Sequence, residues 1–493
     1  MSRNEGGTRA TDPVFQSALQ PCAAARSGSR SAACVVAGAV WIAAELAFSG
    51  AGLVANRSVA AQEKPVAAVA QAADKSPSAA PLPSVEKLSS QPQLPDPLVA
   101  LDGRRIETAS DWKARRRPEL KQLFQHYMYG RIPPKPERWA KDGAAFRDAN
   151  YWGGKAVLSE ETLAFHGPDL AQRLRVLVVR PNKPGPVPMF VAMNFCGNHT
   201  VVADSRVQLP SSWLYASCAG VENNRATDKG RGSQADVWNV DLILERGYGL
   251  ATFYSGDIDP DTPDFADGIE PAFWKPGQSA PGPDDAGAIA AWAWGYHRVV
   301  DYLLATAEHQ ADPERIVAVG HSRNGKTTLL AAAFDERIAL AIPHQAGCGG
   351  TAPSRGKVGE SVKQINDRFP HWFCDAFTQF NDDPSRLPFD QHCLVALCAP
   401  RPVLFTNAIE DQWANPDGQF EVLKAAEPVY KLLNAGGLEA SARPELNKLV
   451  PSSLGYFIRP GKHSMNRQDW QAFLDYADAR LKPKSGAAAG AGK

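Results

Sequence analysis

Residues Arg315–Ala333 read RIVAVGHSRNGKTTLLAAA, and this stretch decides the fold class. An apolar, strand-like run ends at Val319, and a helix-forming run begins at Thr327. Ser322 lies between them, in the segment Gly320-His-Ser-Arg-Asn-Gly-Lys326. A serine in a sharp turn between a strand and a helix presents its hydroxyl beside the backbone N–H groups that begin the helix. The stretch therefore predicts a nucleophilic serine.

The match to the usual G-x-S-x-G pattern of such turns is imperfect. That pattern places its second glycine two residues after the serine, where this chain has Asn324 and where Gly325 follows one residue later. Short motifs also occur by chance, and Ser322 could instead cap the helix that follows a buried strand. The order of polar residues further along the chain favours the nucleophile.

Two later loops supply the partners that a serine nucleophile needs. A loop with Glu410 and Asp411 follows one predicted strand, and a loop with His463 follows the next. α/β-Hydrolases arrange their triad in the order serine, acid, histidine. We therefore expect His463 to take the proton of Ser322, and a carboxylate to fix the imidazole tautomer and stabilise its charged form.

Strand-like runs alternate with helical runs along the chain. Strands are predicted at residues 174–179, 189–193, 249–254, 315–320, 338–342, 403–406 and 455–458. Residues 285–306 are apolar on most faces and predict a long buried helix. Strands separated by helices indicate a mostly parallel sheet covered on both faces, so the predicted class is α/β, of the α/β-hydrolase kind.

The N-terminus predicts export to the periplasm or the medium. Arg26 and Arg30 precede an apolar run at residues 32–44, and Ser58-Val-Ala-Ala61 has the small residues that a signal peptidase reads. The alternative is an uncleaved anchor, but the apolar run is shorter than the ~20 residues of a membrane span. We expect a cleaved signal peptide at residues 1–61 and no membrane span in the mature form.

Composition divides the rest of the chain into three parts. Residues 62–97 are rich in Ala, Pro, Ser and Lys, which predicts a disordered linker. Residues 98–483 are expected to form one α/β-hydrolase domain, and residues 484–493 a flexible tail. A monomer is expected.

Charge and cysteine content limit the possible partners. The chain has 53 Lys and Arg against 53 Asp and Glu and no long basic run, so a nucleic-acid partner is not expected. The predicted domain has six cysteines without C-x-x-C spacing: Cys196, Cys218, Cys348, Cys374, Cys393 and Cys398. No metal or cofactor is expected, and the cysteines are either partly paired or free buried thiols.

At this point the chain resembles a known family, the bacterial glucuronoyl esterases of carbohydrate esterase family 15. The matching segments, which span about residues 190–465, are Asn194-Phe-Cys-Gly-Asn-His-Thr200, Asp257-Ile-Asp-Pro-Asp261, Gly320–Lys326, Phe369-Pro-His-Trp-Phe373, Asp390-Gln-His392, Ala399-Pro-Arg-Pro402, Glu410-Asp-Gln-Trp413 and Gly461-Lys-His463. The resemblance implies a three-layer α/β/α sandwich. It also implies hydrolysis of (4-O-methyl-)glucuronic acid esters, as in lignin–glucuronoxylan linkages, through an acyl-enzyme on Ser322.

The resemblance implies a role for each catalytic residue. Ser322 corresponds to the nucleophile, His463 to the base, and Arg323 to an arginine that stabilises the oxyanion. A fixed guanidinium stabilises an oxyanion more than a neutral donor does. The alternative for Arg323 is a surface ion pair.

The acid departs from the pattern of many family members. Those members have a glutamate where this chain has Gln345, and a neutral amide cannot stabilise a charged imidazole. Other bacterial members place an acid on the later loop, at the position of Asp411. We assign Asp411 as the acid, with Glu410 as the alternative.

Substrate recognition requires polar contacts to a uronate ring. Lys326, Glu360 and Trp413 resemble the sugar-binding residues of the family. The alternatives are a solvated lysine, a surface carboxylate and a core tryptophan.

Two other functions remain open. One is a different exported serine hydrolase, such as an acetylxylan esterase or a peptidase, which an apolar pocket would favour. The other is a non-catalytic carbohydrate-binding relative, suggested by Gln345; the intact Ser322, His463 and Asp411 argue against it. The sequence leaves the alcohol leaving group undetermined.

Overall fold

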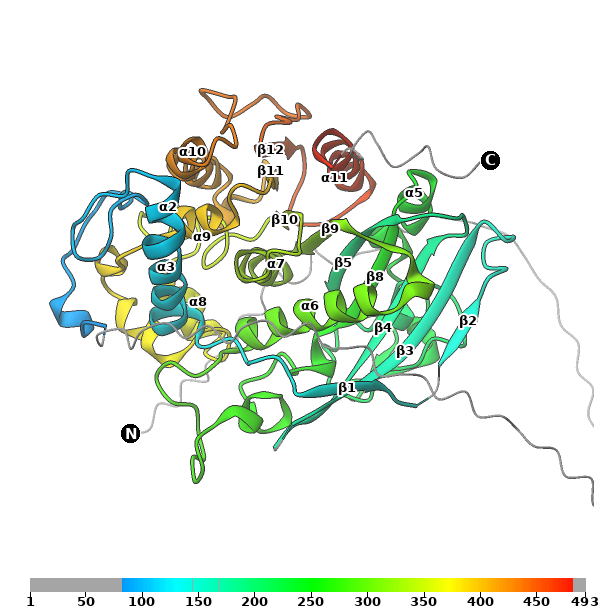
Figure 1. The fold of residues 1–493 in the computed structure, drawn as a ribbon. Coiled ribbons are helices and arrows are strands. Elements are labelled where there is room, and N and C mark those ends of the chain that lie inside the picture. The colour runs from blue at the N-terminus through cyan, green and yellow to red at the C-terminus, as the bar shows by residue number, and fades with distance from the viewer. Residues whose placement is uncertain (1–81, 144, 168, 482–493) are drawn as a thin grey trace, which may run out of the picture. The chain divides into compact units, whose positions relative to one another are not determined.

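One mixed sheet organises the chain (Figure 1), and the computed structural model describes residues 82–143, 145–167 and 169–481. The sheet has ten strands in the order β1-β3-β4-β8-β5-β9-β10-β11-β12, with β2 paired to β3. The strands are β1 (Arg138–Lys141), β2 (Phe146–Asp148), β3 (Ala156–His166), β4 (Ala171–Pro181), β5 (Val187–Asn194), β8 (Gly249–Tyr254), β9 (Ala311–His321), β10 (Leu340–His344), β11 (Val403–Ala408) and β12 (Leu454–Arg459). A separate hairpin pairs β6 (Val221–Glu222) with β7 (Arg225–Ala226).

The sheet is mostly parallel, as predicted. Every pair from β8 through β5, β9, β10 and β11 to β12 is parallel, whereas β1, β2, β3 and β4 pair antiparallel at the other end. Each strand predicted from the sequence overlaps an observed strand. The strands β1, β2 and β3 were not predicted.

Helices cover both faces of the sheet, and Figure 1 shows α6 and α7 on one side of the strands and α5 and α11 on the other. The helices are α2 (Ala109–Asp111), α3 (Arg117–Phe124), α4 (Ala235–Trp238), α5 (Val240–Glu245), α6 (Ala288–Ala305), α7 (Arg323–Phe334), α8 (Val362–Arg368), α9 (Gln391–Cys398), α10 (Pro416–Leu432) and α11 (Arg467–Arg480). The long apolar helix predicted at residues 285–306 is α6.

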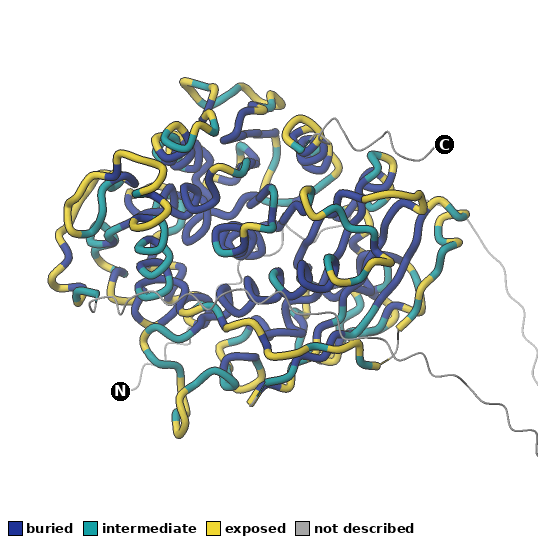
Figure 2. Tube along the Cα trace, in the orientation of Figure 1, coloured by how far each residue is buried: buried dark blue, intermediate teal, exposed yellow. Residues whose placement is uncertain are grey.

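Alternating side chains of the strands divide the core into two layers, because neighbouring residues of a strand point to opposite faces. On one face, Phe190 of β5 packs against Trp470 of α11, with ring centroids 5.4 Å apart. On the other face, Phe253 of β8 packs against Tyr296 of α6 at 5.2 Å. The central strands and α7 are therefore buried along most of their length (Figure 2).

The folded domain begins earlier than the predicted boundary at residue 98. Residues 82–97 were expected to be part of a disordered linker, but Val85 and Leu88 are buried. The backbone carbonyl of Gln91 accepts a hydrogen bond from Arg355 Nε at 2.9 Å, and that of Pro95 accepts one from the ring of His392 at 2.7 Å. Composition did not reveal this packing, because the residues that contact this segment lie far along the chain, in the domain. The predicted signal peptide, linker residues 62–81 and tail residues 484–493 lie outside the described residues.

A disulfide joins Cys196 to Cys218, a pairing that the sequence left open. Cys348, Cys374, Cys393 and Cys398 are buried free thiols. Within the described ranges, no helix has the length and apolar character that a membrane crossing needs, and no group of three or more His, Cys, Asp or Glu side chains could hold a metal ion.

Candidate active site

Ser322 lies in a strained turn between β9 and α7. Its φ of 59° and ψ of −123° are unusual for a residue with a side chain, and such a conformation costs on the order of 1–3 kcal/mol. The turn requires glycine at position 320, because a Cβ there would lie 2.3 Å from the Asn324 carbonyl oxygen. Gly325 likewise lies against the backbone of His344. The turn thus forms although Asn324 occupies the position of the usual second glycine.

Asn324 replaces that glycine without disturbing the turn because its side chain points away from the turn. Its amide donates to the Met193 carbonyl oxygen at 2.8 Å, at the end of β5. The residue is buried. Asn324 therefore joins the serine turn to the neighbouring parallel strand.

His463 contacts a carboxylate from the neighbouring loop. Its Nδ1 lies 2.6 Å from Asp411 Oδ2, and Asp411 is 6% exposed. A ring N–H at Nδ1 donates to this oxygen, which leaves Nε2 as the acceptor nitrogen. The adjacent Glu410 is exposed, and the contact it makes to the histidine loop is from its backbone N–H to the Gly461 carbonyl oxygen at 3.0 Å.

Gln345 supports the histidine loop through the backbone. Its Oε1 accepts a hydrogen bond from the Ser464 N–H at 3.0 Å, and the residue is buried. The amide thus fixes the residue after His463. At the position where many family members have a glutamate, this chain has a neutral side chain that holds the loop.

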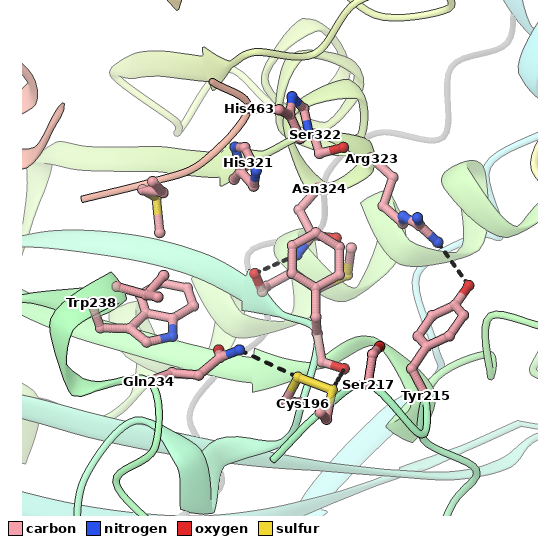
Figure 3. A pocket seen from close by; sticks show the side chains of 15 residues that line it. Cys196, Tyr215, Ser217, Gln234, Trp238, His321, Ser322, Arg323, Asn324 and His463 are labelled. Atoms are coloured by element: carbon pink, nitrogen blue, oxygen red, sulfur yellow. Dashed lines mark hydrogen bonds between the residues drawn. A yellow bond between two sulfur atoms is a disulfide. The ribbon is translucent and has the colours of Figure 1, made fainter. Parts of the chain in front are cut away.

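Ser322 and His463 line the same two pockets, and Figure 3 shows the one that also contains Trp238 and the disulfide. No hydrogen bond joins their side chains in the described part of the chain. Such bonds are often long in unliganded enzymes and tighten when the substrate binds. The buried ring of His321 lies 4.4 Å from that of His463, and burial, followed by the neighbouring His463, holds its pKa well below the ordinary value. His321 therefore stays neutral beside His463.

Arg323 is buried and held in an ion pair, so it is not a surface charge. Its Nη1 donates to Asp261 Oδ2 and, at 2.8 Å, to the Tyr215 hydroxyl. Its guanidinium carbon also lies 4.5 Å from the ring centroid of Trp372 and 5.0 Å from that of Phe369. Burial acts to lower the pKa of Arg323, but Asp261 and Tyr215 together outweigh it, and the net direction is upward. The guanidinium is a permanent positive charge beside the serine.

Asp261 is fixed from a second direction. Its Oδ1 accepts hydrogen bonds from His371 Nε2 and Trp372 Nε1, both at 2.8 Å. Burial acts to raise the pKa of this carboxyl, yet Arg323 and these donors hold it below its ordinary value. Asp261 is therefore a buried anion that orients Arg323.

One of these pockets has about 520 Å³ of empty space and a lining that is mostly apolar but includes five Asp, Glu, Lys or Arg side chains. We call it the polar pocket because of these side chains. Lys326, Glu360 and Trp413, the predicted sugar-binding residues, all line it. Lys326 Nζ donates to the backbone carbonyl oxygens of Ala346 and Cys348, each at 2.5 Å, and burial lowers its pKa. Burial also raises the pKa of Glu360.

Trp413 is 37% exposed, so it lies at the rim of this pocket and not in the core. Neither Lys326 nor Glu360 is a fully solvated surface charge, because Lys326 is buried and Glu360 is half-buried. The pocket thus combines a cation, a carboxyl group and an aromatic ring, the kinds of groups that bind sugar hydroxyls and ring faces.

The other pocket is larger, with about 870 Å³ of empty space, and of the Asp, Glu, Lys and Arg side chains of the described chain it is lined by Arg323 alone. We call it the apolar pocket. Figure 3 shows Trp238, Gln234 and the disulfide along the side of it that lies away from Ser322. Ser322 therefore lies where a polar and an apolar pocket meet.

Sequence reasoning missed the residues that hold Arg323. Asp261 and Trp372 belong to segments that carry the family resemblance, Asp257–Asp261 and Phe369–Phe373, but no role was predicted for either residue. Tyr215 had no signal at all. These residues lie 46 to 111 positions apart in pairs such as Tyr215–Asp261 and Asp261–Trp372, so local pattern could not join them.

The strand–serine–helix turn on a mostly parallel sheet with helices on both faces defines an α/β-hydrolase. Comparisons with known proteins identify the group within this class. The family model described as fungal glucuronyl esterase matches residues 270–434. Carbohydrate esterase MZ0003, from an unknown prokaryotic organism, is 42% identical over 393 residues, which are 79% of this chain and 89% of that protein.

Solved structures agree with these matches. A promiscuous CE15 esterase from a marine bacterial metagenome is 41% identical with a TM-score of 0.73, over 81% of this chain and 99% of that one. The glucuronoyl esterase from Solibacter usitatus is 36% identical with a TM-score of 0.73, over 80% and 100% of the two chains. The chain belongs to carbohydrate esterase family 15, the family of the glucuronoyl esterases.

Proposed function

We propose that the protein hydrolyses esters of (4-O-methyl-)glucuronic acid through an acyl-enzyme on Ser322. The observation that carries this proposal is the polar pocket beside Ser322, lined by Lys326, Glu360 and Trp413. A uronate ring carries several hydroxyls close to its carboxyl carbon, so a sugar in this pocket brings the ester carbonyl to the serine.

In the first step, His463 Nε2 takes the proton of Ser322 Oγ while the oxygen attacks the ester carbonyl. Asp411 holds Nδ1 at 2.6 Å and stabilises the imidazolium that forms. The carbonyl electron pair moves to its oxygen, and the negative charge is stabilised by Arg323 and by the N–H groups that begin α7. Because Arg323 is fixed by Asp261 and Tyr215 before the reaction, little reorganisation accompanies this charge.

In the second step, the tetrahedral intermediate expels the alcohol, which takes the proton from His463 Nε2. Water then enters and loses a proton to His463, and its oxygen attacks the glucuronoyl-serine. The same Arg323 stabilises the second oxyanion, and Ser322 leaves with the proton returned by the imidazole. The products are glucuronic acid and the free alcohol.

We assign one half of the ester to each of the two pockets. With the uronate in the polar pocket, the alcohol extends across Ser322 into the apolar pocket. Its lining includes Phe195, Trp238 and Met465, which suits an apolar alcohol of the kind that lignin offers. The proposed substrate is therefore the ester between glucuronoxylan and a lignin alcohol, and the proposed place of action is outside the cytoplasm, after cleavage of the signal peptide.

A second candidate function comes from the apolar pocket. An esterase of simple acyl groups would place its acyl chain in the apolar pocket and leave the polar pocket unused. The second candidate function is therefore that of an acetylxylan esterase. Both candidate functions use the same catalytic residues. They differ in the acyl group that the enzyme prefers.

The test compares two esters of the same alcohol, benzyl glucuronate and benzyl acetate. We expect kcat/KM to favour the glucuronate ester by at least ~10³, because a site built to bond hydroxyls rejects analogues that lack them. Ser322→Ala should lose ~10⁶ in kcat on both esters. A preference for benzyl acetate would transfer the assignment to the second candidate.

A further inference from the structure

Arg323 needs more than its charge to act on an oxyanion. An arginine side chain has several rotatable bonds, and stabilisation of a transition state requires donors that are in place beforehand. The guanidinium has two fixed partners of different origin. Asp261 follows β8 and is locked by His371 and Trp372, whereas Tyr215 lies in a segment without helix or strand.

The hydroxyl of Tyr215 has a defined orientation. It accepts from Arg323 Nη1 at 2.8 Å and donates to the backbone carbonyl oxygen of Asp261 at 3.3 Å. A guanidinium has donors and no acceptor, so the Tyr215 oxygen accepts in the bond to Arg323 that Figure 3 shows, and the phenol proton is left for Asp261. The Tyr215 hydroxyl thus connects the loop of Asp261 to the guanidinium of Arg323.

The segment that carries Tyr215 is anchored covalently. The Cys218 N–H donates to the Tyr215 carbonyl oxygen at 3.0 Å, which closes a turn between the two residues. Cys218 is joined to Cys196, which directly follows Phe195. The rings of Tyr215 and Phe195 both flank Arg323, with centroids 5.4 and 5.7 Å from its guanidinium carbon. One disulfide therefore joins the two segments that hold these rings.

We propose that Tyr215 is a positioning residue for Arg323, and that the Cys196–Cys218 disulfide keeps Tyr215 in the place where it can act. This inference rests on the oxyanion role of Arg323 in the proposed function. Tyr215 contributes through the guanidinium and not through contact with the sugar. The export that we propose would place the protein where such a bond persists.

The expected signature is a loss of turnover without a loss of substrate binding. Tyr215→Phe keeps the ring beside Arg323 and removes the oxygen alone. Removal of a whole oxyanion donor costs ~10²–10³ in kcat, so the loss of a positioning contact should cost less, about 10-fold. The KM should change less than two-fold.

A double-mutant cycle with Arg323→Ala tests whether Tyr215 acts through Arg323. If it does, Tyr215→Phe lowers kcat in the wild-type background. It has almost no effect when Arg323 is alanine, because the guanidinium that Tyr215 positions is then absent. Tyr127→Phe is the matched control, since it removes a phenol oxygen that donates to the Pro83 carbonyl, and Tyr127 lines neither of the two pockets beside Ser322. Additive losses, or a change in KM alone, would overturn the positioning role.

The disulfide is tested by the paired variant Cys196→Ser with Cys218→Ser, assayed well below its Tm. We expect kcat to fall in the same direction as for Tyr215→Phe, and addition of Tyr215→Phe to cost little more. Unchanged turnover in the paired variant would refute the role of the disulfide. The Tyr215→Phe cycle remains informative even if the cysteine variant folds poorly.

Failure of this inference can be told apart from failure of the proposed function. The rate at which an alkyl fluorophosphonate inactivates Ser322 also depends on the oxyanion site but needs no sugar. If wild-type protein does not cleave glucuronate esters, the proposed function fails, and the cycle can still be measured on this rate. If it cleaves them and the cycle is additive, the inference alone fails.

Discussion

Asp411→Asn is the substitution that examines the proposed catalytic chemistry most directly. The carboxylate oxygen Oδ2 lies 2.6 Å from His463 Nδ1, and the residue is 6% exposed, so water can replace the lost charge only poorly. Asparagine has nearly the same shape and can present its N–H to Nδ1. That contact places the imidazole proton on Nε2, the nitrogen that must accept the proton of Ser322.

The wrong tautomer alone costs ~10⁴ in kcat in a serine triad, or about 5 kcal/mol of transition-state stabilisation. We expect a loss of this size in Asp411→Asn on benzyl glucuronate, with KM changed by less than three-fold. Glu410→Gln is the control, because the Glu410 side chain is exposed. It should stay within two-fold of wild type.

The assay is steady-state hydrolysis at pH 7, with Tm measured for both variants to confirm folding. If Glu410→Gln loses the activity and Asp411→Asn keeps it, the acid is misassigned by one residue. If neither variant is impaired, Ser322 and His463 act without an acid and the reasoning from the 2.6 Å contact is refuted.

Three further predictions concern the oxyanion, the sugar and pH. Arg323→Lys should lower kcat by ~10²–10³ with little change in KM, because an ammonium lacks the planar fork that Asp261 and Tyr215 hold; equal changes in both constants would contradict an oxyanion role. Glu360→Gln should reduce the kcat/KM ratio of benzyl glucuronate to benzyl acetate by ~10-fold or more, and an unchanged ratio would remove Glu360 from the sugar site. Burial raises the pKa of Glu270 to about 8 from an ordinary 4.5, and it also raises the pKa of Asp259, which faces Glu270, well above its ordinary value. The folded state therefore holds a proton that the unfolded state releases, and the free energy of unfolding should fall by a few kcal/mol as pH rises from about 4.5 to about 8. Glu270→Gln should flatten this slope in Tm between pH 5 and pH 8, and an unaltered slope would contradict the assignment.

Most of the central strands could be predicted from the local pattern of apolar and polar residues. The central strands are buried on both faces, so they appear as continuous apolar runs between polar loops, and all seven predicted strands overlap observed ones. The strand β3 was missed because its sequence, AVLSEETLAFH, mixes polar and apolar residues without a clear period. It belongs to the antiparallel end of the sheet, where pairing with β4 decides the conformation.

The sequence by itself determined the strand–serine–helix turn at Ser322 and the chain order of acid and histidine loops, because each depends on residues that are neighbours in the chain. Local pattern did not distinguish the adjacent Glu410 and Asp411, and the family resemblance alone favoured Asp411. The path of the loop between β11 and α10 turns Asp411 toward His463 and leaves Glu410 exposed.

Only the tertiary structure decided which cysteines pair and what holds Arg323. Cys196 and Cys218 come together because the end of β5 meets an irregular segment 22 residues later. Asp261, Tyr215 and Trp372 reach the guanidinium from three separate loops. Buried charges need partners at hydrogen-bond distance, and sequence spacing does not reveal which distant loops meet when the sheet and its covering helices pack.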